Sequence, residues 1–147
     1  MIIFNELKIY SESLAAKKAA ELFICEVESR SKINTCFCLK ENSNVFFLDN
    51  NNLSKDSYVI EYKDKNICFY ASGIRGFIFA FGMFLRKAEK LGDGICLAED
   101  ISGSYSPDKR IRGHQIGYRT TPNTYDAWSY EDYRRYYLDM MFFGSNT

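Results

Sequence analysis

Residues 58–70 read YVIEYKDKNICFY, and this stretch decides the fold. Its two runs of β-branched and aromatic residues, 58–62 and 67–70, flank the polar tetrapeptide 63–66, a pattern typical of antiparallel strands joined by a tight turn. The chain continues into a segment, 74–91, that predicts a helix. The apolar part of that helix is much shorter than the roughly 20 residues that a membrane span requires. We therefore predict a helix that packs on a sheet containing the hairpin.

Two further elements are predicted before the hairpin. Residues 2–10 are expected to form a first strand, after which Ser11 or Ser13 caps a helix that runs to about Ser29. The apolar residues of this helix recur at helical spacing: Ala16, Ala20, Phe23 and Val27. The polar, mixed stretch that follows predicts no regular element, whereas the short apolar run 45–48 predicts a buried strand.

The composition changes after the helix at 74–91. Glycine and serine residues between 93 and 107 indicate a connection, and we place the domain linker at 101–110. Beyond it, the sequence predicts a strand at 111–118, an irregular loop at 119–128, and a helix at 129–143 with a serine as its N-cap.

The bulk composition excludes several classes of protein. Nineteen basic and nineteen acidic residues cancel, so no long-range field gathers nucleic acid or an anionic membrane, and neither is expected as a partner. The five cysteines lack paired Cys-x-x-Cys spacing and accompany a single histidine, so we expect no metal site and no cofactor. No secretory signal opens the sequence. The chain as it stands is expected in the cytoplasm, with an exported parent protein as the alternative.

Three segments carry a resemblance to a known group of enzymes. Residues 58–80 contain SGIRGFIFA after the hairpin, residues 109–119 read KRIRGHQIGYR, and residues 133–146 end in MMFFGSN. Together they resemble the N-terminal region of several glycoside hydrolases, including family 20 hexosaminidases and family 67 α-glucuronidases. The second segment resembles the first strand of the barrel in these enzymes, and the third resembles its first helix.

The resemblance implies an α+β fold in two parts. Residues 1–100 would form an accessory domain, with a small sheet and two helices on one face. Residues 101–110 would be the linker, and residues 111–147 would supply the first strand and helix of a truncated (β/α)8 barrel.

The resemblance also implies where a sugar would bind. Active sites of such barrels lie at the C-terminal ends of the strands, so the first strand and its loop would line one wall of the site. The candidate substrate-binding residues are Arg112, His114, Tyr118, Arg119, Asn123, Tyr125, Asp126 and Trp128. Their aromatic members would stack on sugar rings, and their polar members would hydrogen-bond to hydroxyl groups.

The main candidates have structural alternatives. Arg112 matches an arginine with which family 20 enzymes hold sugar hydroxyls, and its alternative role is a structural salt bridge. Tyr125 and Trp128 would otherwise pack the loop against the helix. His114 has the chemistry of a general acid or base, but a lone histidine in a strand is more often a core or wall residue, which we favour.

Glycoside hydrolysis requires two carboxyl groups that flank the bond, and the resemblance places that pair on later strands. Asp126 and Asp139 are not a credible substitute, because Asp139 falls in the middle of the last helix. We therefore expect a non-catalytic N-terminal part of a glycoside hydrolase, inactive alone, with carbohydrate as the partner of the full-length enzyme. The alternative is a stand-alone carbohydrate-binding or protein-interaction domain without catalysis. The last helix also presents an apolar stripe, which a complete barrel would cover, and in isolation it is expected to fold back on the small domain, to self-associate or to remain exposed. The residues of this stripe are Tyr133, Tyr136, Tyr137, Met140, Met141 and Phe143.

Overall fold

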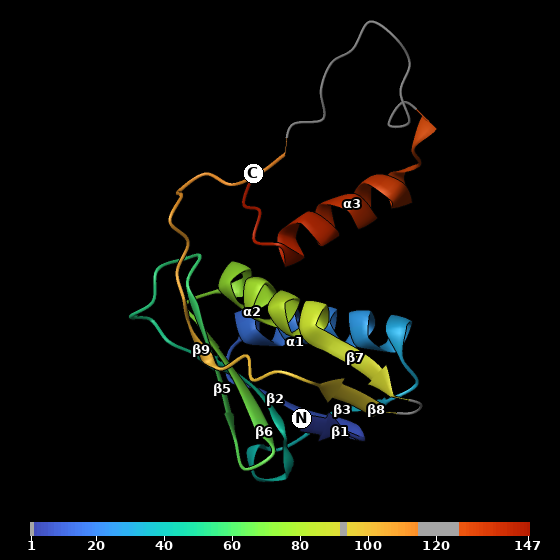
Figure 1. Cartoon of the computed structure of the whole chain (residues 1–147). Coiled ribbons are helices and arrows are strands. Elements are labelled where there is room, and N and C mark those ends of the chain that lie inside the picture. The colour runs from blue at the N-terminus through green and yellow to red at the C-terminus, as the bar shows by residue number, and fades with distance from the viewer. Residues whose placement is uncertain (1, 92–93, 115–126) are drawn as a thin grey trace, which may run out of the picture.

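The computed structural model describes residues 2–91, 94–114 and 127–147. Its centre is a six-stranded mixed sheet with the strand order β3-β2-β4-β6-β5-β9. The bounds are β2 Glu6–Ser11, β3 Asn34–Phe37, β4 Val45–Asp49, β5 Tyr58–Lys63, β6 Asn66–Ala71 and β9 Gly103–Tyr105. Helices α1 (Leu14–Arg30) and α2 (Ile74–Lys87) lie side by side on one face of this sheet (Figure 1). The expected α+β arrangement, with two helices on one face, is confirmed.

The predicted hairpin is confirmed as β5 and β6, which pair antiparallel from Tyr58↔Ala71 to Lys63↔Asn66. Asp64 and Lys65 both have positive φ, 51° and 68°. Two consecutive left-handed residues match the twist of the flanking strands, which is why the turn closes tightly between them.

The core lies between the sheet and the two helices, and Phe23 of α1 is at its centre. Its ring centroid lies 5.8 Å from that of Phe47, 6.0 Å from Phe69, 5.6 Å from Phe81 and 5.5 Å from Phe84, and all five side chains are fully buried. These rings come from α1, β4, β6 and α2. One aromatic cluster therefore joins every layer of the domain.

A second, three-stranded sheet corrects two of the expected boundaries. Its order is β1-β8-β7, with β1 at Ile2–Phe4, β8 at Gly94–Leu97 and β7 at Ala88–Leu91. The expected single first strand is thus split into β1 and β2, which join different sheets. The helix expected to reach residue 91 ends at Lys87, because the next four residues pair antiparallel with β8 instead.

Two stretches expected to be irregular contain strands. The polar stretch after α1 holds β3 and a short 3-10 helix, Lys40–Asn42; β3 pairs parallel with β2 at the sheet edge. The segment 101–110, expected as a linker, holds β9, which pairs antiparallel with β5. Both are edge strands with mostly half-buried or exposed side chains, so neither has the apolar pattern that sequence reasoning uses.

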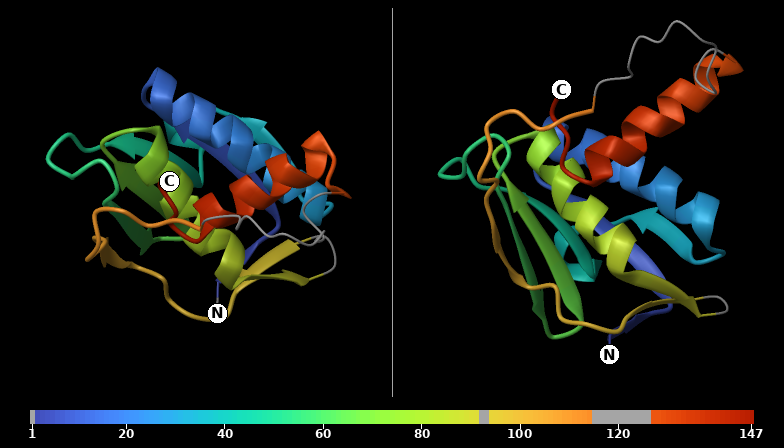
Figure 2. Two further views of the ribbon diagram at one scale, coloured as in Figure 1. Left: turned by 90° about the horizontal axis from the view of Figure 1, so that it is seen from above. Right: turned by 45° about the horizontal axis from the view of Figure 1, so that its top comes forward.

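Helix α3 (Tyr130–Phe142) forms a further layer on top of α2 (Figure 2). Its N-cap is Ser129, as expected, and Asp132 completes a capping box. Phe142 is 3% exposed and its ring lies 5.5 Å from that of Phe81. The helices touch closely at Gly82, where an added Cβ would lie 2.6 Å from the carbonyl oxygen of Phe142. Met141 of the apolar stripe also packs against the buried core, so part of the stripe is covered.

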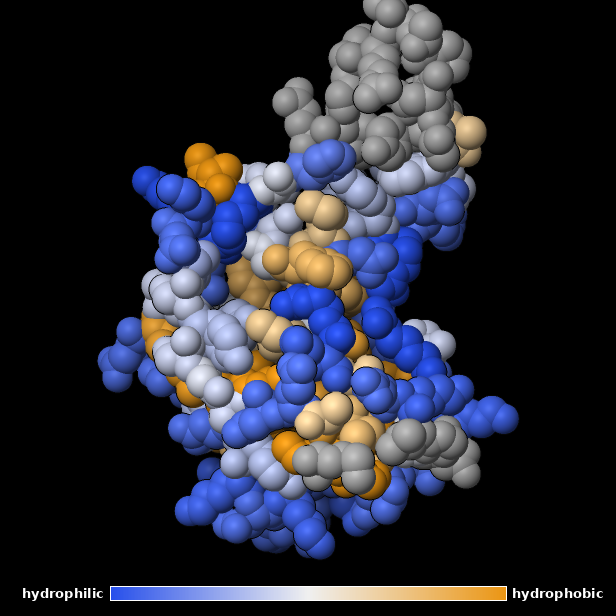
Figure 3. Space-filling model, in the orientation of Figure 1, coloured by the Kyte–Doolittle hydropathy of each residue, from blue (hydrophilic) through white to orange (hydrophobic). Residues whose placement is uncertain are grey.

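Two members of the stripe remain at the surface, Tyr137 at 52% and Phe143 at 73% exposed, and so does Tyr130 at 76%. Figure 3 shows apolar atoms, interrupted by hydrophilic ones, over the region between α3 and α2. No helix in the described part of the chain has the length and apolar character needed to cross a membrane.

The strand expected at 111–118 is not formed in its described part, since residues 111–114 have no regular structure and 115–118 lie outside the described residues. The backbone of Arg112 instead pairs with the end of the chain. Its carbonyl oxygen accepts hydrogen bonds from the amides of Asn146, at 2.8 Å, and Thr147, at 3.2 Å. Segments on either side of α3 are thereby held next to each other.

Candidate functional site

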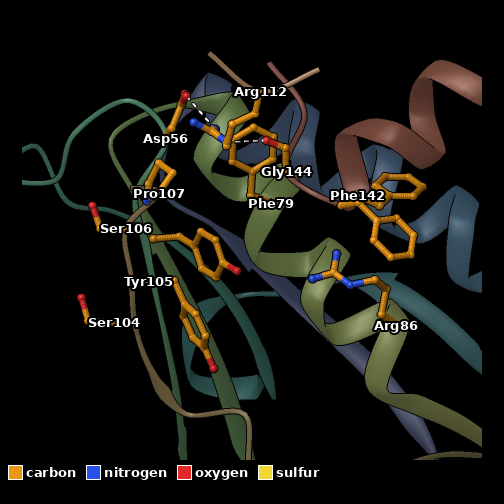
Figure 4. A pocket seen from close by; sticks show the side chains of 12 residues that line it. Asp56, Phe79, Arg86, Ser104, Tyr105, Ser106, Pro107, Arg112, Phe142 and Gly144 are labelled. Atoms are coloured by element: carbon orange, nitrogen blue, oxygen red, sulfur yellow. Dashed lines mark hydrogen bonds and ion pairs between the residues drawn. The ribbon is translucent and has the colours of Figure 1, made fainter. Parts of the chain in front are cut away.

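The candidate site lies where α2, α3 and the segment 104–114 meet, and Asp56, in the loop before β5, lies at its edge beside Arg112 (Figure 4). Asp56 is 9% exposed and binds three side chains. Its Oδ1 accepts a hydrogen bond from Arg75 Nε at 2.5 Å. Its Oδ2 accepts from Arg112 Nη2 at 2.9 Å and from Asn146 Nδ2 at 2.7 Å. Residues from three distant parts of the sequence converge on this one carboxylate.

The charge state of Asp56 follows from this environment. Burial alone raises the pKa of its carboxyl, but hydrogen bonds from Arg112, Asn146 and Arg75 outweigh burial and hold the pKa below its ordinary value. The group is therefore ionised near neutral pH. It serves as an anchor for two guanidinium groups, not as a proton donor.

Arg112 uses its guanidinium entirely within the protein. Besides the ion pair with Asp56, its Nε donates to the carbonyl oxygen of Gly144 at 2.9 Å and its Nη1 donates to that of Lys109 at 2.6 Å. The guanidinium also lies over the ring of Phe79, 5.6 Å from its centroid. These contacts are those of the structural salt bridge considered as its alternative role. Contact of Arg112 with a sugar remains a prediction.

Next to this network the surface is hollowed into a cavity of about 380 Å³. Phe79, Phe142, Tyr58 and Tyr105 provide aromatic walls, and the two tyrosine rings are stacked with centroids 4.9 Å apart. The polar lining comes from the Asp56 and Arg112 pair, two serines and Arg86. Figure 4 shows side chains from β9, α2 and the chain around α3 facing this space. The cavity combines aromatic faces with hydrogen-bonding groups.

His114 and Trp128 lie against α3. His114 is exposed, and its Nδ1 is hydrogen-bonded to the hydroxyl of Tyr136. The Trp128 ring centroid lies 5.3 Å from that of Tyr136 and 5.2 Å from that of Tyr133. The structure therefore supports the packing alternative for Trp128 and gives His114 a tyrosine partner. A sugar-binding role for either residue stays a prediction.

The other candidates, Tyr118, Arg119, Asn123, Tyr125 and Asp126, lie outside the described residues. Asp139, expected at a helix surface, pairs with Arg135 of the same helix. Arg135 also binds Glu26 of α1 through its Nη1, at 2.9 Å from Oε2. Across the described ranges, no group of three or more metal-binding side chains is present.

Sequence reasoning missed Asp56, Arg86, Tyr58 and Tyr105. Asp56 stands in a polar stretch before the hairpin, and Arg112 follows it by 56 residues. No local pattern links such distant positions. Tyr105 lay in a segment expected as a linker, so its stacking on Tyr58 depended on recognising β9. An excess of aromatic residues, 16% of the chain, was the one available signal.

No protein-family model matches the sequence, and no curated protein matches it. The fold is similar to part of the GH20 exo-β-N-acetylglucosaminidase of Vibrio harveyi, over 64% of this chain and 15% of that chain at 14% identity. The TM-score is 0.58 for an inactive mutant of that enzyme and 0.57 for its complex with N-acetylglucosamine.

The β-N-acetylhexosaminidase of Bacteroides fragilis is similar with a TM-score of 0.51 and 19% identity, over 62% of this chain and 19% of that chain. The chain thus spans less than a fifth of the length of these proteins. At such identities the likeness establishes a hexosaminidase-like fold for the domain.

Proposed function

We propose that this chain is the N-terminal, non-catalytic part of a carbohydrate-active glycoside hydrolase related to the family 20 β-N-acetylhexosaminidases. Residues 1–100 would support the barrel, and residues 111–128 would supply one wall of its sugar-binding site. The observation that carries the proposal is the hydrogen-bonded contact between Arg112 and residues 146–147 on either side of α3.

In the proposed enzyme, that contact would mark the start of a parallel barrel. In such a barrel a strand is followed by a helix, and the next strand begins beside the start of the previous one. Here the amides of Asn146 and Thr147, just after α3, both donate to the carbonyl oxygen of Arg112. The Arg112 amide donates in return to Asn146 Oδ1, at 2.9 Å. Residues 111–114 and 145–147 lie next to each other, and in the proposed enzyme they would open two adjacent barrel strands.

The Asp56 network gives the supporting role a physical basis. Asp56 belongs to the accessory domain, and it binds Arg112 at the first of these positions and Asn146 at the second. A second attachment comes from Glu26 of α1, which is 6% exposed and binds Arg135 of α3. The accessory domain would therefore fix both the strand ends and the first helix of the barrel.

We expect no catalysis from this chain alone, and the pairing of two of its carboxylates supports this. Asp56 is neutralised by two arginines, and Asp139 is paired with Arg135. Neither is placed as one of two carboxyl groups facing a glycosidic bond. Catalysis would require later strands, and the choice between hexosaminidase and α-glucuronidase chemistry would also depend on them.

A stand-alone carbohydrate-binding domain is the second candidate. It is favoured by the aromatic side chains on the outer face of α3, where Tyr130 and Tyr137 are mostly exposed. Exposed rings of this kind stack on sugars, but they equally well make protein contacts.

Self-association through the outer face of α3 is expected if no other part of the protein covers that face, and light scattering would then show a mass that depends on concentration. A constant monomer mass would contradict it.

Activity separates the two candidates. The full gene product that contains this chain is expected to hydrolyse p-nitrophenyl N-acetyl-β-D-glucosaminide, and residues 1–147 alone are expected to release no nitrophenol. A gene product that ends at Thr147 and binds N-acetylglucosamine without turnover would support the second candidate instead. Turnover by the purified 147-residue chain would contradict the non-catalytic assignment.

A further inference from the structure

Arg86 of α2 is a cation without an ionic partner. No ion pair within residues 2–91, 94–114 and 127–147 includes it. Its Nη1 is buried and has no hydrogen-bond partner, the one side-chain nitrogen or oxygen of the described residues in that state. Its Nη2 reaches only the sulfur of Met83, at 3.5 Å. A guanidinium group in this position lacks the anion that normally offsets the cost of burial.

The same guanidinium borders the cavity beside Arg112. In Figure 4 it extends from α2 toward the space bounded by Phe79, Phe142 and Tyr105. The cavity volume, about 380 Å³, falls within the usual range of small-molecule sites. The cavity therefore has room for an anion beside the Arg86 guanidinium.

Tyr58 lines the same cavity. Burial raises the pKa of Tyr58, and the nearby charge of Arg86 opposes this only in part. Tyr58 therefore stays protonated near neutral pH and has an O–H to donate to an anion. The stacked ring of Tyr105 uses its own hydroxyl elsewhere, donating to the carbonyl oxygen of Ile101 at 2.9 Å.

We propose that this cavity binds a small organic monocarboxylate with a flat ring. The carboxylate would pair with Arg86 and accept from the Tyr58 hydroxyl, while the ring would lie against Phe79 and Phe142. This site goes beyond the proposed hydrolase function and does not depend on it.

The aromatic walls select this ligand class over inorganic anions. Arg86 supplies a positive charge that has no anionic partner among the described residues, whereas Arg112 shares the single negative charge of Asp56 with Arg75. The rings of Phe79 and Phe142 offer a flat organic ring an apolar surface that phosphate has no means of using. The planar fork of a guanidinium also matches the two oxygens of a carboxylate.

Phe143 lies over the guanidinium of Arg86. Its ring centroid lies 4.8 Å from Cζ of Arg86, so the ring covers one face of the guanidinium. Phe143 is nevertheless 73% exposed, and turning its ring outward removes no core contact. Binding is therefore expected to move the resonances of Phe143 as well as those of the cavity walls.

Titration of the 147-residue chain with benzoate, followed by amide and aromatic NMR shifts, tests the proposal. Benzoate is expected to bind saturably. The affinity for benzamide is expected to be at least about tenfold lower, because benzamide lacks the negative charge of the carboxylate. Arg86→Met is expected to lower the affinity for benzoate by at least about tenfold. The matched control is Arg134→Met, at an exposed arginine of α3, which should leave that affinity unchanged.

Three results would overturn the proposal. They are the absence of saturable shifts with benzoate, equal binding of benzoate and benzamide, and tighter binding of inorganic phosphate than of benzoate. The comparison of benzoate with benzamide uses the unchanged chain, so it decides the matter even if Arg86→Met fails to fold. The titration uses no glycoside. Failure of the carboxylate-site proposal can therefore be distinguished from failure of the hydrolase proposal.

Discussion

Two regions of this molecule are stabilised by different interactions: the domain formed by the sheet with α1 and α2, and the segments around α3 that are attached to it. The sheet with α1 and α2 is organised around buried rings, with Phe23 in contact with four other phenylalanines. Residues 106–114 and 127–147 are attached to it through directional polar contacts at Asp56 and Glu26 and through the apolar side chains of Phe142, Leu138 and Met141. Apolar burial has no directional requirement, whereas hydrogen bonds to one shared carboxylate fix the relative positions of the groups that donate to it. The first part is therefore a stable platform, and the second is a positioned attachment.

The largest effect is expected in the aromatic core. Phe47→Ala removes a fully buried ring that contacts Phe23, Phe69, Phe77 and Phe81, and should lower the free energy of unfolding by about 3–5 kcal/mol. Urea denaturation followed by circular dichroism measures this. A loss below about 1 kcal/mol would mean that this cluster is not the centre of the core.

A smaller effect is expected where α3 meets α2. In Gly82→Ala the new methyl group would lie 2.6 Å from the carbonyl oxygen of Phe142, so α3 must shift, at a cost of about 1–3 kcal/mol. Hydrogen exchange should show faster exchange in α3 than in the sheet. Gly73→Ala is the matched control, since an added Cβ there meets nothing within 4 Å. Equal effects of the two substitutions would contradict the close contact.

Asp56→Asn should release the attachment without unfolding the platform. It removes the charge shared by Arg75 and Arg112, and we expect a loss of about 1–2 kcal/mol, because the Arg75 side chain is 40% exposed and partly screened. The amides of Asn146 and Thr147 should exchange faster, while those of β4 and β6 should not. Uniformly faster exchange would show that the two parts are one cooperative unit.

The same carboxylate predicts a pH dependence. The folded-state pKa of Asp56 is depressed below its ordinary value of 3.8, so its contribution is complete above that pH and is lost as the pH falls through the folded-state pKa. Below about pH 4 the difference in stability between the native chain and Asp56→Asn should shrink. A difference that stays constant down to pH 2 would contradict this.

The smallest effect is expected at the start of α3. Ser129→Ala removes the hydroxyl that accepts from the amide of Asp132 at 3.2 Å, and typical N-cap losses are about 1 kcal/mol. The effect should be confined to the first turn of α3 in hydrogen exchange. Ser13→Ala, at the N-cap of α1, should instead destabilise the platform as a whole.

The difference between local patterns and distant contacts explains how much of the structure could be predicted from the sequence. The hairpin at 58–70, the N-cap at Ser129 and the buried strand at 45–48 follow from local patterns, and all three are confirmed. The strands β3 and β9 were missed because edge strands expose their side chains and carry no apolar alternation. The helix expected to reach residue 91 was too long because pairing with β8 claimed its last four residues.

The candidate site was harder to predict than the fold. Arg112 was identified through the resemblance, but its partner Asp56 comes from the far side of the hairpin, and only the folded chain brings them together. Arg86 belongs to a helix that the sequence predicts only as a buried packing element. Its lack of an ionic partner among the described residues becomes visible only when its neighbours in the folded chain are known. Five of the eight expected sugar contacts lie outside the described residues, and they stay predictions.

The most direct test of the barrel assignment is a crystal structure of the full gene product, read at the register between Arg112 and Asn146. Residues 111–118 are expected to form a strand that runs parallel to one starting at residues 145–147, with Asp56 bound to both Arg112 and Asn146. A structure in which residues 111–118 pair with the accessory sheet, or in which no parallel strand follows α3, would contradict the assignment.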